Sequence, residues 1–561
     1  MSVSDRITKL TPEQRAVLRA RLQKKYMEGG DSIPLRPDPT VWPLSFSQER
    51  LWFLDQLEPG AQYNDYTAYR FTGPLNVPAL ERSLNEVVRR HEALRSIFPM
   101  VDGEPRQIAL PEMWVPMPVV DVSGLPEEMR TVAAEQLGGD EVRRPFDLAT
   151  GPLVRALVLR TAPGDHRVVL NMHHIVCDGW SALIINRELA LIYDSLSRGV
   201  SWYLPELPIQ YADYAHWQRQ WLRGAVLEKQ VAWWKEQLDG APPLLEMPSD
   251  RPRPRARSGR GTRLYLILPG RLASGLQTLA QREGATGFMA QLAVVAVLLH
   301  RWSGQDDLSI GTPTAGRNRV ELEGMIGFFV NPLVLRMRLD GDPSFREVLR
   351  RVREATVGAF AHQDIPFERL VEEVQPDRDL SYTPLFQVMF ASQVGGAEAA
   401  PEMSGEGSAA QLGMVGLPIS NQTAKFDLVF HFWEEPGSLG GWMELDVDLY
   451  DTPTVLRLLG HLEVLLGGIV ADPDAPVSTL PLLTEAERQQ VVHEWNDWTI
   501  QRPEETIPEM ILAQAARTPD ALALVFGDER LSYAEAFRRA SALADHLRDL
   551  GAGPDAPVGI S

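Results

Sequence analysis

Two adjacent histidines followed by an aspartate form the part of this chain best suited to acid–base chemistry. They are His173, His174 and Asp178 in the string MHHIVCDGWS, which also contains Cys177 and Gly179. An imidazole has a pKa of about 6.5, so it is largely neutral at pH 7 and can accept a proton there. One histidine of the pair is therefore a candidate general base. Asp178 could orient an imidazole, or be held by an arginine so that the turn stays fixed.

The histidine pair stands at the end of an apolar, β-branched run over residues 168–176, which predicts a buried strand. Neighbouring residues of a strand point to opposite faces, so we expect one histidine to act and the other to be buried as structure. Ser181 is a candidate cap for a following helix. Apolar residues at spacings of 4, 3 and 4 place this helix: Ile185, Leu189, Ile192 and Leu196.

Other interpretations of the same motif stay open. A metal site could use both histidines and Asp178, but their opposed faces and the lack of a further close cluster argue against it. A cysteine hydrolase built on Cys177 is equally disfavoured, because a lone cysteine is more often a small packed residue than a nucleophile. A histidine pair at a strand end is also often purely structural. General-base catalysis by one histidine is the best functional alternative to that structural role.

Composition excludes several classes of function. The chain has 561 residues, with 55 Lys+Arg against 75 Asp+Glu, a net charge of −20. This charge repels phosphate backbones and anionic lipid, so we expect neither nucleic-acid nor membrane binding. A single cysteine allows no disulfide framework within the chain and indicates a cytoplasmic setting. Charged residues near the N-terminus argue against a signal peptide, and the most apolar stretch, residues 288–299, is too short for a membrane span.

Changes in composition and in hydrophobic pattern along the chain predict four segments. Residues 1–37 read as a short charged helix and a linker, a possible docking element for an upstream protein. Residues 42–485 alternate β-branched runs with amphipathic helices, which predicts an α/β fold. This span exceeds one core, so we expect two lobes with a boundary near residues 215–235, around a tryptophan-rich helix. A linker over residues 486–505 then leads to an incomplete unit over residues 506–561.

Two segments read as loops, and the C-terminal unit has its own elements. The basic segment 251–263 (RPRPRARSGRGTR) is expected to be extended and solvated, with contact to an acidic partner as the weaker alternative. Residues 393–418 are small and glycine-rich, which predicts a mobile loop. In the last unit we predict helices over residues 507–516 and 533–550, and strands over residues 521–527 and 556–561.

The string HHIVCDG fits the pattern HHxxxDG, and with it the chain resembles the condensation domain of nonribosomal peptide synthetases. The resemblance extends over nearly all of residues 42–485. It rests on further motifs in chain order: SFSQERLWFL, RRHEALRSIF, YADYAHW, IGFFVNPLVLR, HQDIPFERL and RDLSYTPLFQ. The resemblance implies an α/β fold of two chloramphenicol-acetyltransferase-like lobes that form a V with a central tunnel.

The resemblance also implies a reaction and a set of site residues. An acyl or peptidyl thioester on one carrier domain would be transferred to the amine of an aminoacyl thioester on another. His174 would be catalytic as base or positioner. Beside the resemblance, the position of Gly179 in the tight turn suggests that its backbone N–H is offered to the developing oxyanion. Pro332 stands where the family usually has a threonine. Because proline has no backbone N–H to donate, this departure leaves the conformation of the local loop open. Structural roles at the active site are implied for His173, Asp178, Arg317 and Asn331.

Partners and cofactors follow from the same resemblance. The chain itself would bind no cofactor and no metal, because its substrates arrive on the phosphopantetheine arms of carrier domains. The acceptor carrier would be downstream, and the donor would be an upstream carrier in trans or an acyl starter. LSYAEAF resembles the start of an adenylation domain, too incomplete for amino-acid activation. An epimerisation domain, or a catalytically silent module that recruits a partner enzyme, are the alternatives.

Overall fold

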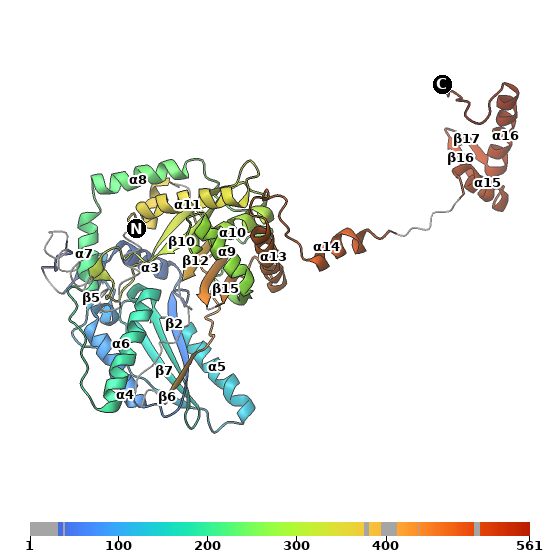
Figure 1. Cartoon of the computed structure of the whole chain (residues 1–561). Coiled ribbons are helices and arrows are strands. Elements are labelled where there is room, and N and C mark those ends of the chain that lie inside the picture. Colours follow the sequence, from blue (N-terminus) through green and yellow to red (C-terminus); the bar gives the residue numbers. More distant parts are fainter. Residues whose placement is uncertain are drawn as a thin grey trace. The chain divides into compact units, whose positions relative to one another are not determined.

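The computed structural model consists of two compact units, one up to Thr484 and one from Glu485 onward, and Figure 1 shows the elements of each. The predicted helix within residues 1–37 lies almost wholly outside the described part of the chain. The described residues are 32–37, 40–374, 381–393, 412–435, 437–498 and 505–560.

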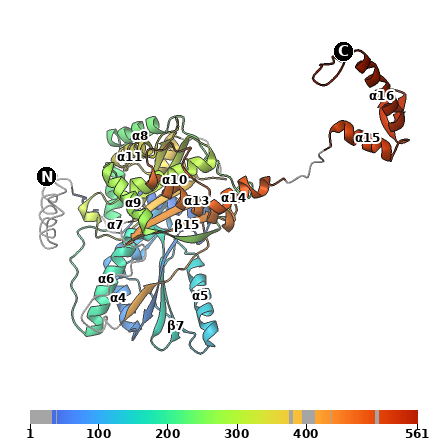
Figure 2. The same cartoon turned by 45° about the vertical axis from the view of Figure 1, so that its right-hand side comes forward.

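The first lobe of the large unit is a five-stranded sheet in the order β13-β2-β8-β7-β6. Helices α4 (Val77–Arg90) and α6 (Gly179–Arg198) cover one face and α5 (Glu127–Arg143) covers the other, as Figure 2 shows. Apolar side chains of these helices pack against the sheet. β2 and β8 pair antiparallel along their full length. The strands are β2 Asn64–Thr72, β6 Val119–Asp121, β7 Val154–Ala162, β8 Asp165–His173 and β13 Gly413–Gly416.

The second lobe is a six-stranded sheet in the order β11-β10-β12-β14-β15-β9, packed against helices in one large apolar core. Every residue from Ala290 to Leu299 of its central helix is buried, as expected of a helix surrounded on all sides. The strands are β9 Gly261–Leu268, β10 Asp307–Thr314, β11 Asn331–Arg338, β12 Val388–Gln393, β14 Leu428–Glu435 and β15 Ser438–Asp446. The helices are α9 Gly270–Arg282, α10 Gly287–Ser303, α11 Phe345–Ala361, α12 Phe367–Val374 and α13 Thr452–Ala471.

Shorter elements border the two lobes. A small sheet has the order β1-β5-β3, with β4 paired to β5. The prediction of a single tryptophan-rich helix near the lobe boundary is wrong. Two helices lie there, α7 (Tyr211–Trp221) and α8 (Ala225–Leu238), and they are separated at Gly224, whose φ is 51°. The other short elements are β1 Trp42–Pro43, α3 Phe46–Leu57, η1 Glu92–Arg95, β3 Ser96–Ile97, β4 Met100–Val101, β5 Glu104–Ala109, η2 His174–Val176 and η3 Val320–Leu322.

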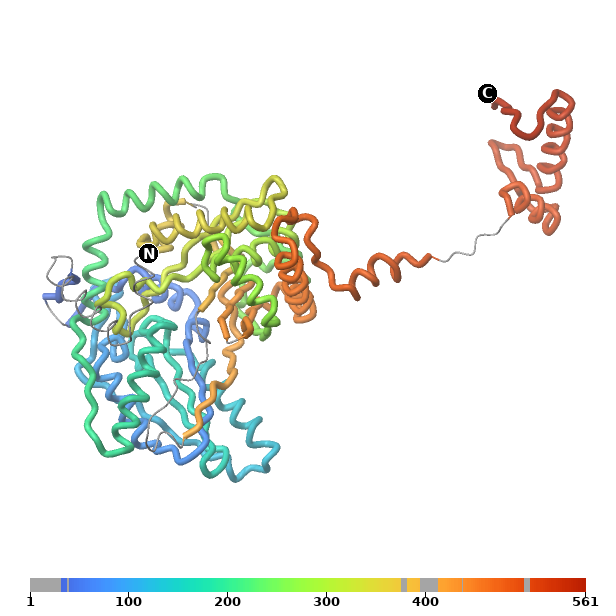
Figure 3. The backbone as a smooth tube through the Cα atoms, viewed as in Figure 1, coloured from blue at the N-terminus to red at the C-terminus, as the bar shows by residue number. Residues whose placement is uncertain are grey.

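The prediction of a loop over residues 393–418 is wrong at its C-terminal end. Gly413–Gly416 form β13, which pairs antiparallel with β2 although it follows β12 in the chain. Figure 3 shows this orange segment running from the second lobe to the side of the first. Leu417 continues the contact by donating its N–H to the carbonyl of Ala68. The first lobe is therefore completed by a strand from the second half of the unit, which local composition does not reveal.

α13 is the one helix in the described part of the chain that is long and apolar enough by itself to cross a membrane, and α9 with α10 passes the same test only as a pair bent by 110°. The test is also passed by core helices of globular domains. α13 fits that case because Leu458, Leu462 and Leu465 are buried in the second-lobe core.

The small unit is a two-stranded sheet with helices. Both predicted helices are confirmed as α15 (Ile507–Arg517) and α16 (Tyr533–Asp549), and the first predicted strand as β16 (Leu522–Phe526). β16 pairs with β17, Glu529–Ser532. The strand predicted at the C-terminus is wrong, because residues 556–560 form none. The predicted linker contains α14 Glu485–Val492 and η5 Glu494–Asn496.

Candidate active site

The histidine pair lies where β8 ends, and its two side chains have different surroundings. His173 is the last residue of β8, is buried, and accepts a hydrogen bond at Nδ1 from the Ile175 N–H at 3.1 Å. Its ring packs edge-on against Phe146, and burial lowers its pKa to about 3. His174 opens the short helix η2, and 19% of its side chain is exposed. His173 is thus a neutral core residue, whereas His174 retains access.

The surroundings of His174 select one form of its imidazole. Its Nδ1 lies 3.1 Å from the carbonyl oxygen of Cys177, which can only accept, so Nδ1 carries the hydrogen. The lone pair is then on Nε2, which has no hydrogen-bond partner within the described ranges. Burial, together with the nearby cation of Lys425, lowers the pKa of His174, while Asp65 opposes that change. A neutral ring with a free Nε2 is the form that can take a proton from an amine.

Asp65 is a charged residue beside His174 that sequence analysis missed. Its Oδ2 lies 3.8 Å from His174 Nδ1 and 3.7 Å from Cys177 Sγ. Asp65 is the second residue of β2, at the point where that strand pairs with the end of β8. The carbonyl of Tyr63, just before β2, accepts the backbone N–H of His174 at 2.8 Å. No local signal reveals this, because the partner strand is a property of the fold.

Asp65, His174 and Cys177 place potential metal-ligand atoms within 4.8 Å of one another, but their chemistry does not suit a cation. Burial raises the pKa of the Cys177 thiol well above its usual value, so the sulfur stays protonated, and a thiolate is needed as ligand or nucleophile. His174 Nδ1 is engaged with a carbonyl, and the Lys425 ammonium adds positive charge. These features argue against a metal site at the three residues and against Cys177 as a nucleophile.

Asp178 anchors the turn after the histidines to the second lobe. It is fully buried and is the N-cap of α6, where Oδ1 accepts the N–H and hydroxyl of Ser181, each at 2.7 Å. Arg317 donates to Oδ1 at 3.1 Å, and the Phe329 N–H donates to Oδ2 at 3.1 Å. The prediction that Ser181 caps this helix is wrong, because the capping oxygen belongs to Asp178. Ser181 instead bonds to Asp178, Arg317 and Gly327.

Gly179 is the first residue of α6, directly after Asp178. N–H groups in the first turn of a helix have no acceptor within the helix and carry partial positive charge. Apart from Gly179 itself, its chain neighbours and the backbone of α6, no heavy atom of the described residues lies within 4 Å of the position that a Cβ would occupy at Gly179. The helix start therefore leaves space beside a backbone donor, as an oxyanion would need.

Asn331 and Pro332 open β11. The Asn331 side chain donates to the carbonyls of Gln363 and Ile365 and accepts the Phe367 N–H, so it fixes the loop before α12. None of these partners is His174. Pro332 is not in a loop, contrary to the expectation. It faces a second proline, Pro313 of β10, in the antiparallel register. Neither proline has an N–H to donate, which suits a pair without mutual hydrogen bonds in an edge strand.

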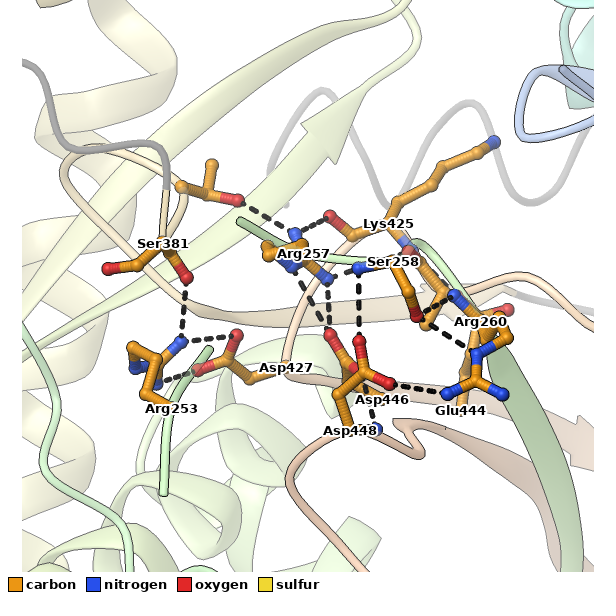
Figure 4. A network of polar contacts seen from close by, with 12 residues as sticks. Arg253, Arg257, Ser258, Arg260, Ser381, Lys425, Asp427, Glu444, Asp446 and Asp448 are labelled. Carbon is orange, nitrogen blue, oxygen red and sulfur yellow. Dashed lines mark hydrogen bonds and ion pairs between the residues drawn. The ribbon is translucent and has the colours of Figure 1, made fainter. Parts of the chain in front are cut away.

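Lys425 is the second charged residue that sequence analysis missed. Its Nζ lies 5.3 Å from the centroid of the Tyr63 ring, and burial lowers its pKa. Its carbonyl oxygen accepts a hydrogen bond from Arg257 Nη1 at 2.7 Å. Figure 4 shows the Lys425 side chain extending away from the cluster of arginines and aspartates that includes Arg257. The ammonium is therefore held near the site by contacts at the base of its own side chain.

The basic segment that carries Arg257 is not a freely solvated loop, which corrects the prediction for residues 251–263. Arg253 pairs with Asp427 and Arg257 with Asp446, and both carboxylates are almost fully buried (Figure 4). Arg260 pairs with Asp448 nearer the surface. The segment has no helix, as its prolines predict, and many of its residues are exposed, but its last three residues begin β9 and Arg253 and Arg257 bind buried carboxylates of this chain.

Comparison with known proteins indicates one family for most of the chain. Residues 39–492 match the Condensation domain family, and residues 511–561 match the AMP-binding enzyme family. A linear gramicidin synthase of Brevibacillus parabrevis is 44% identical over 524 residues, 92% of this chain and 10% of that protein. Phosphinothricin tripeptide synthetase PhsC of Streptomyces viridochromogenes is 40% identical over 566 residues, 99% of this chain and 51% of that protein. The chain thus spans about a tenth to a half of these relatives.

Solved structures agree with this assignment of fold. A four-domain nonribosomal peptide synthetase, AB3403, bound to AMP and glycine superposes with a TM-score of 0.75 at 24% identity, over 94% of this chain and 40% of that chain. The X-domain in complex with OxyB from teicoplanin biosynthesis has a TM-score of 0.72 at 28% identity, over 81% of this chain and 98% of that one. The predicted two-lobed α/β fold is confirmed.

Proposed function

Because this chain belongs to the condensation-domain family of nonribosomal peptide synthetases, whose members are amide-forming acyltransferases, we propose that it joins two carrier-bound substrates. The donor is an acyl or peptidyl thioester, and the acceptor is the amine of an aminoacyl thioester. Both are presented on the phosphopantetheine arms of carrier domains. The chain contributes protein groups alone, with no bound cofactor.

The observation that carries this proposal is the state of His174. Its Nδ1–H is directed to the Cys177 carbonyl, and its lowered pKa keeps Nε2 ready to accept a proton at pH 7. The acceptor amine attacks the donor carbonyl, the C–N bond forms, and an amine proton passes to Nε2. The C–S bond then breaks, and the proton leaves with the thiol. Gly179 N–H supports the oxyanion between these steps, while His173, Asp178, Arg317 and Asn331 hold the surrounding backbone.

Two alternatives are separated from condensation by the same experiment. The likeness to an X-domain whose structure is a complex with OxyB favours, as second candidate, a silent module that recruits a partner enzyme. An epimerisation domain would instead exchange the proton at the α-carbon of a carrier-bound residue. Neither alternative forms an amide between two substrates, so the product mass distinguishes them from condensation.

The test uses the full chain with a loaded donor carrier and a loaded acceptor carrier, followed by intact-protein mass spectrometry. We expect the acceptor to gain the mass of the donor acyl group, and His174→Ala to slow this transfer by about 10²–10⁴-fold. His493→Ala, at an exposed histidine of the small unit, is the matched control and should transfer normally. Carrier binding without transfer would support recruitment, and α-proton exchange in D₂O without transfer would support epimerisation.

A further inference from the structure

The pairing of β2 with β8 places a carboxylate on the same side of the sheet as His174. Asp65 lies directly opposite Met172 in the antiparallel register. His174 lies just beyond β8 as the first residue of η2, but its backbone N–H still bonds to the Tyr63 carbonyl next to Asp65, and its Nδ1 lies 3.8 Å from Asp65 Oδ2. Asn64, the partner of His173, points to the other face and donates to the carbonyls of Val142 and Arg144. The register therefore assigns Asp65 to His174 and not to His173.

Asp65 and the Cys177 carbonyl approach His174 from one side of its ring. The carbonyl oxygen lies 3.1 Å and Asp65 Oδ2 lies 3.8 Å from the same atom, Nδ1. The carbonyl fixes which nitrogen bears the hydrogen, while the carboxylate adds the negative charge that a carbonyl lacks. The opposite nitrogen, Nε2, is left for the reacting proton. The ring is thus held at one end and free at the other.

We propose that Asp65 is a positioning residue for amide formation, which orients His174 from its Nδ1 side and stabilises the positive charge that appears on that ring. This inference rests on the proposed function. When the amine proton reaches Nε2, the ring becomes an imidazolium with Asp65 beside Nδ1. When that proton passes to the sulfur as the C–S bond breaks, the ring is neutral again, so Asp65 gains and loses no proton.

Charged groups from several elements face His174 and act in opposite directions. Asp65 on β2 and Asp178 before α6 favour the imidazolium, whereas Lys425 before β14 opposes it. His173, the preceding residue, stays neutral in the core. Asp178 is already paired with Arg317, and the apolar ring of Phe328 lies 5.6 Å from that of His174. Asp65 and Lys425 are therefore the two charges whose removal shifts the basicity of His174 in opposite senses.

The kinetic test compares Asp65→Asn and Asp65→Glu with the wild type, in the full chain with both loaded carriers. We expect Asp65→Asn to slow single-turnover transfer by about 10–100-fold, by analogy with the loss of groups that orient metal-bound histidines. Asp65→Glu should recover most of the rate because it restores the charge. Wild-type transfer by Asp65→Asn would overturn the inference.

A second measurement separates positioning from a merely structural effect and from failure of the proposed function. NMR of histidine-labelled full-length chain, with the His174 signals assigned by their loss in His174→Ala, gives the pKa of His174 without substrates. Asp65→Asn should lower this pKa and Lys425→Met should raise it. A slowed variant with an unchanged pKa would overturn the inference. If the wild type transfers nothing, the proposed function fails. In that case, a His174 pKa that is unchanged in Asp65→Asn would also overturn the contact between Asp65 and His174.

Discussion

Asp65 and Asp178 both lie near His174, but they differ in how their oxygens are used. Asp178 is fully buried and its carboxylate accepts hydrogen bonds from Ser181, Arg317 and the Phe329 N–H. A carboxylate whose two oxygens both accept hydrogen bonds already has its negative charge balanced by fixed donors. It therefore joins the two lobes and holds the turn at which α6 begins.

Asp65 is not surrounded by such a set of donors among the described residues. Its side chain is 27% exposed, and its oxygen lies near the Nδ1 of His174 and the thiol of Cys177. A carboxylate with loose surroundings can respond to charge that develops nearby during a reaction. The contrast teaches that the fully bonded aspartate of the motif is structural, whereas the aspartate outside the motif is placed to influence the chemistry.

The largest expected effect is on stability at the junction of the lobes. Asp178→Asn leaves the Arg317 guanidinium buried without its counter-charge, which should lower the free energy of unfolding by about 3–5 kcal/mol. Asp65→Asn, at a partly exposed site, should lower it by less than about 1 kcal/mol. Urea denaturation followed by tryptophan fluorescence measures both. Equal losses would remove the distinction between the two aspartates.

The next effect concerns the ion pairs that fix the Lys425 backbone. Arg257→Met removes the partner of Asp446, whose side chain is 1% exposed, and should cost about 2 kcal/mol of unfolding free energy. Arg260→Met is the control on the same segment, because the Arg260 side chain is 71% exposed. It should change that free energy by less than about 0.5 kcal/mol. Equal losses of unfolding free energy in both variants would show that the basic segment behaves as a solvated loop.

A smaller effect is expected from pH in the second lobe. Burial lowers the pKa of His431 to about 4, and its ring stacks on Trp442. Between the pKa of an unfolded histidine, about 6.5, and the folded-state pKa of about 4, the unfolded chain binds the proton more readily than the folded chain. The stability that the neutral His431 contributes is therefore complete above pH 6.5. It is lost as pH falls towards 4, by about 1.4 kcal/mol of unfolding free energy per pH unit.

His431→Phe keeps an aromatic ring in that stack and removes the titrating group. Its unfolding free energy should fall by about 2 kcal/mol less than that of the wild type between pH 7 and pH 5. Urea midpoints at the two pH values measure the difference. A variant as acid-sensitive as the wild type would show that His431 titrates normally in the folded protein.

The smallest effect is expected at Cys177, which is fully buried and keeps its thiol protonated. Cys177→Ala removes one small apolar group and should cost about 1 kcal/mol of stability while acyl transfer continues. The mass-spectrometric transfer assay and urea denaturation check these together. A stable variant that no longer transfers the acyl group would support Cys177 as a nucleophile, which the raised thiol pKa argues against.

Much of the site could be predicted from local sequence. Alternation along a strand predicts opposite faces for His173 and His174, and the structure places one in the core and one in the accessible site. Capping chemistry predicts a helix start in this turn, although the oxygen that caps it is that of Asp178 and not of Ser181. The ordered motifs identify the family, and the resemblance that they support points to the arginine that pairs with Asp178.

The errors share one physical cause, which is contact between segments far apart in the chain. Residues 413–416 look like loop because glycine surrounds them, yet they extend the first-lobe sheet beside β2. Arginines of the basic segment look solvated, yet their carboxylate partners lie about 170 to 190 residues away in sequence. Pro332 looks disruptive, yet it lies at the start of the edge strand β11, where a residue without an N–H is tolerated.

The sequence by itself determined the family, the α/β class and the histidine proposed as the base, because motif spacing, strand alternation and helix caps are local properties. Only the tertiary structure decided that Asp65 and Lys425 face His174. The first depends on the register between β2 and β8, and the second on a backbone held by Arg257. Register and ion-pair partners are chosen by the packing of whole sheets, so no local pattern contains them.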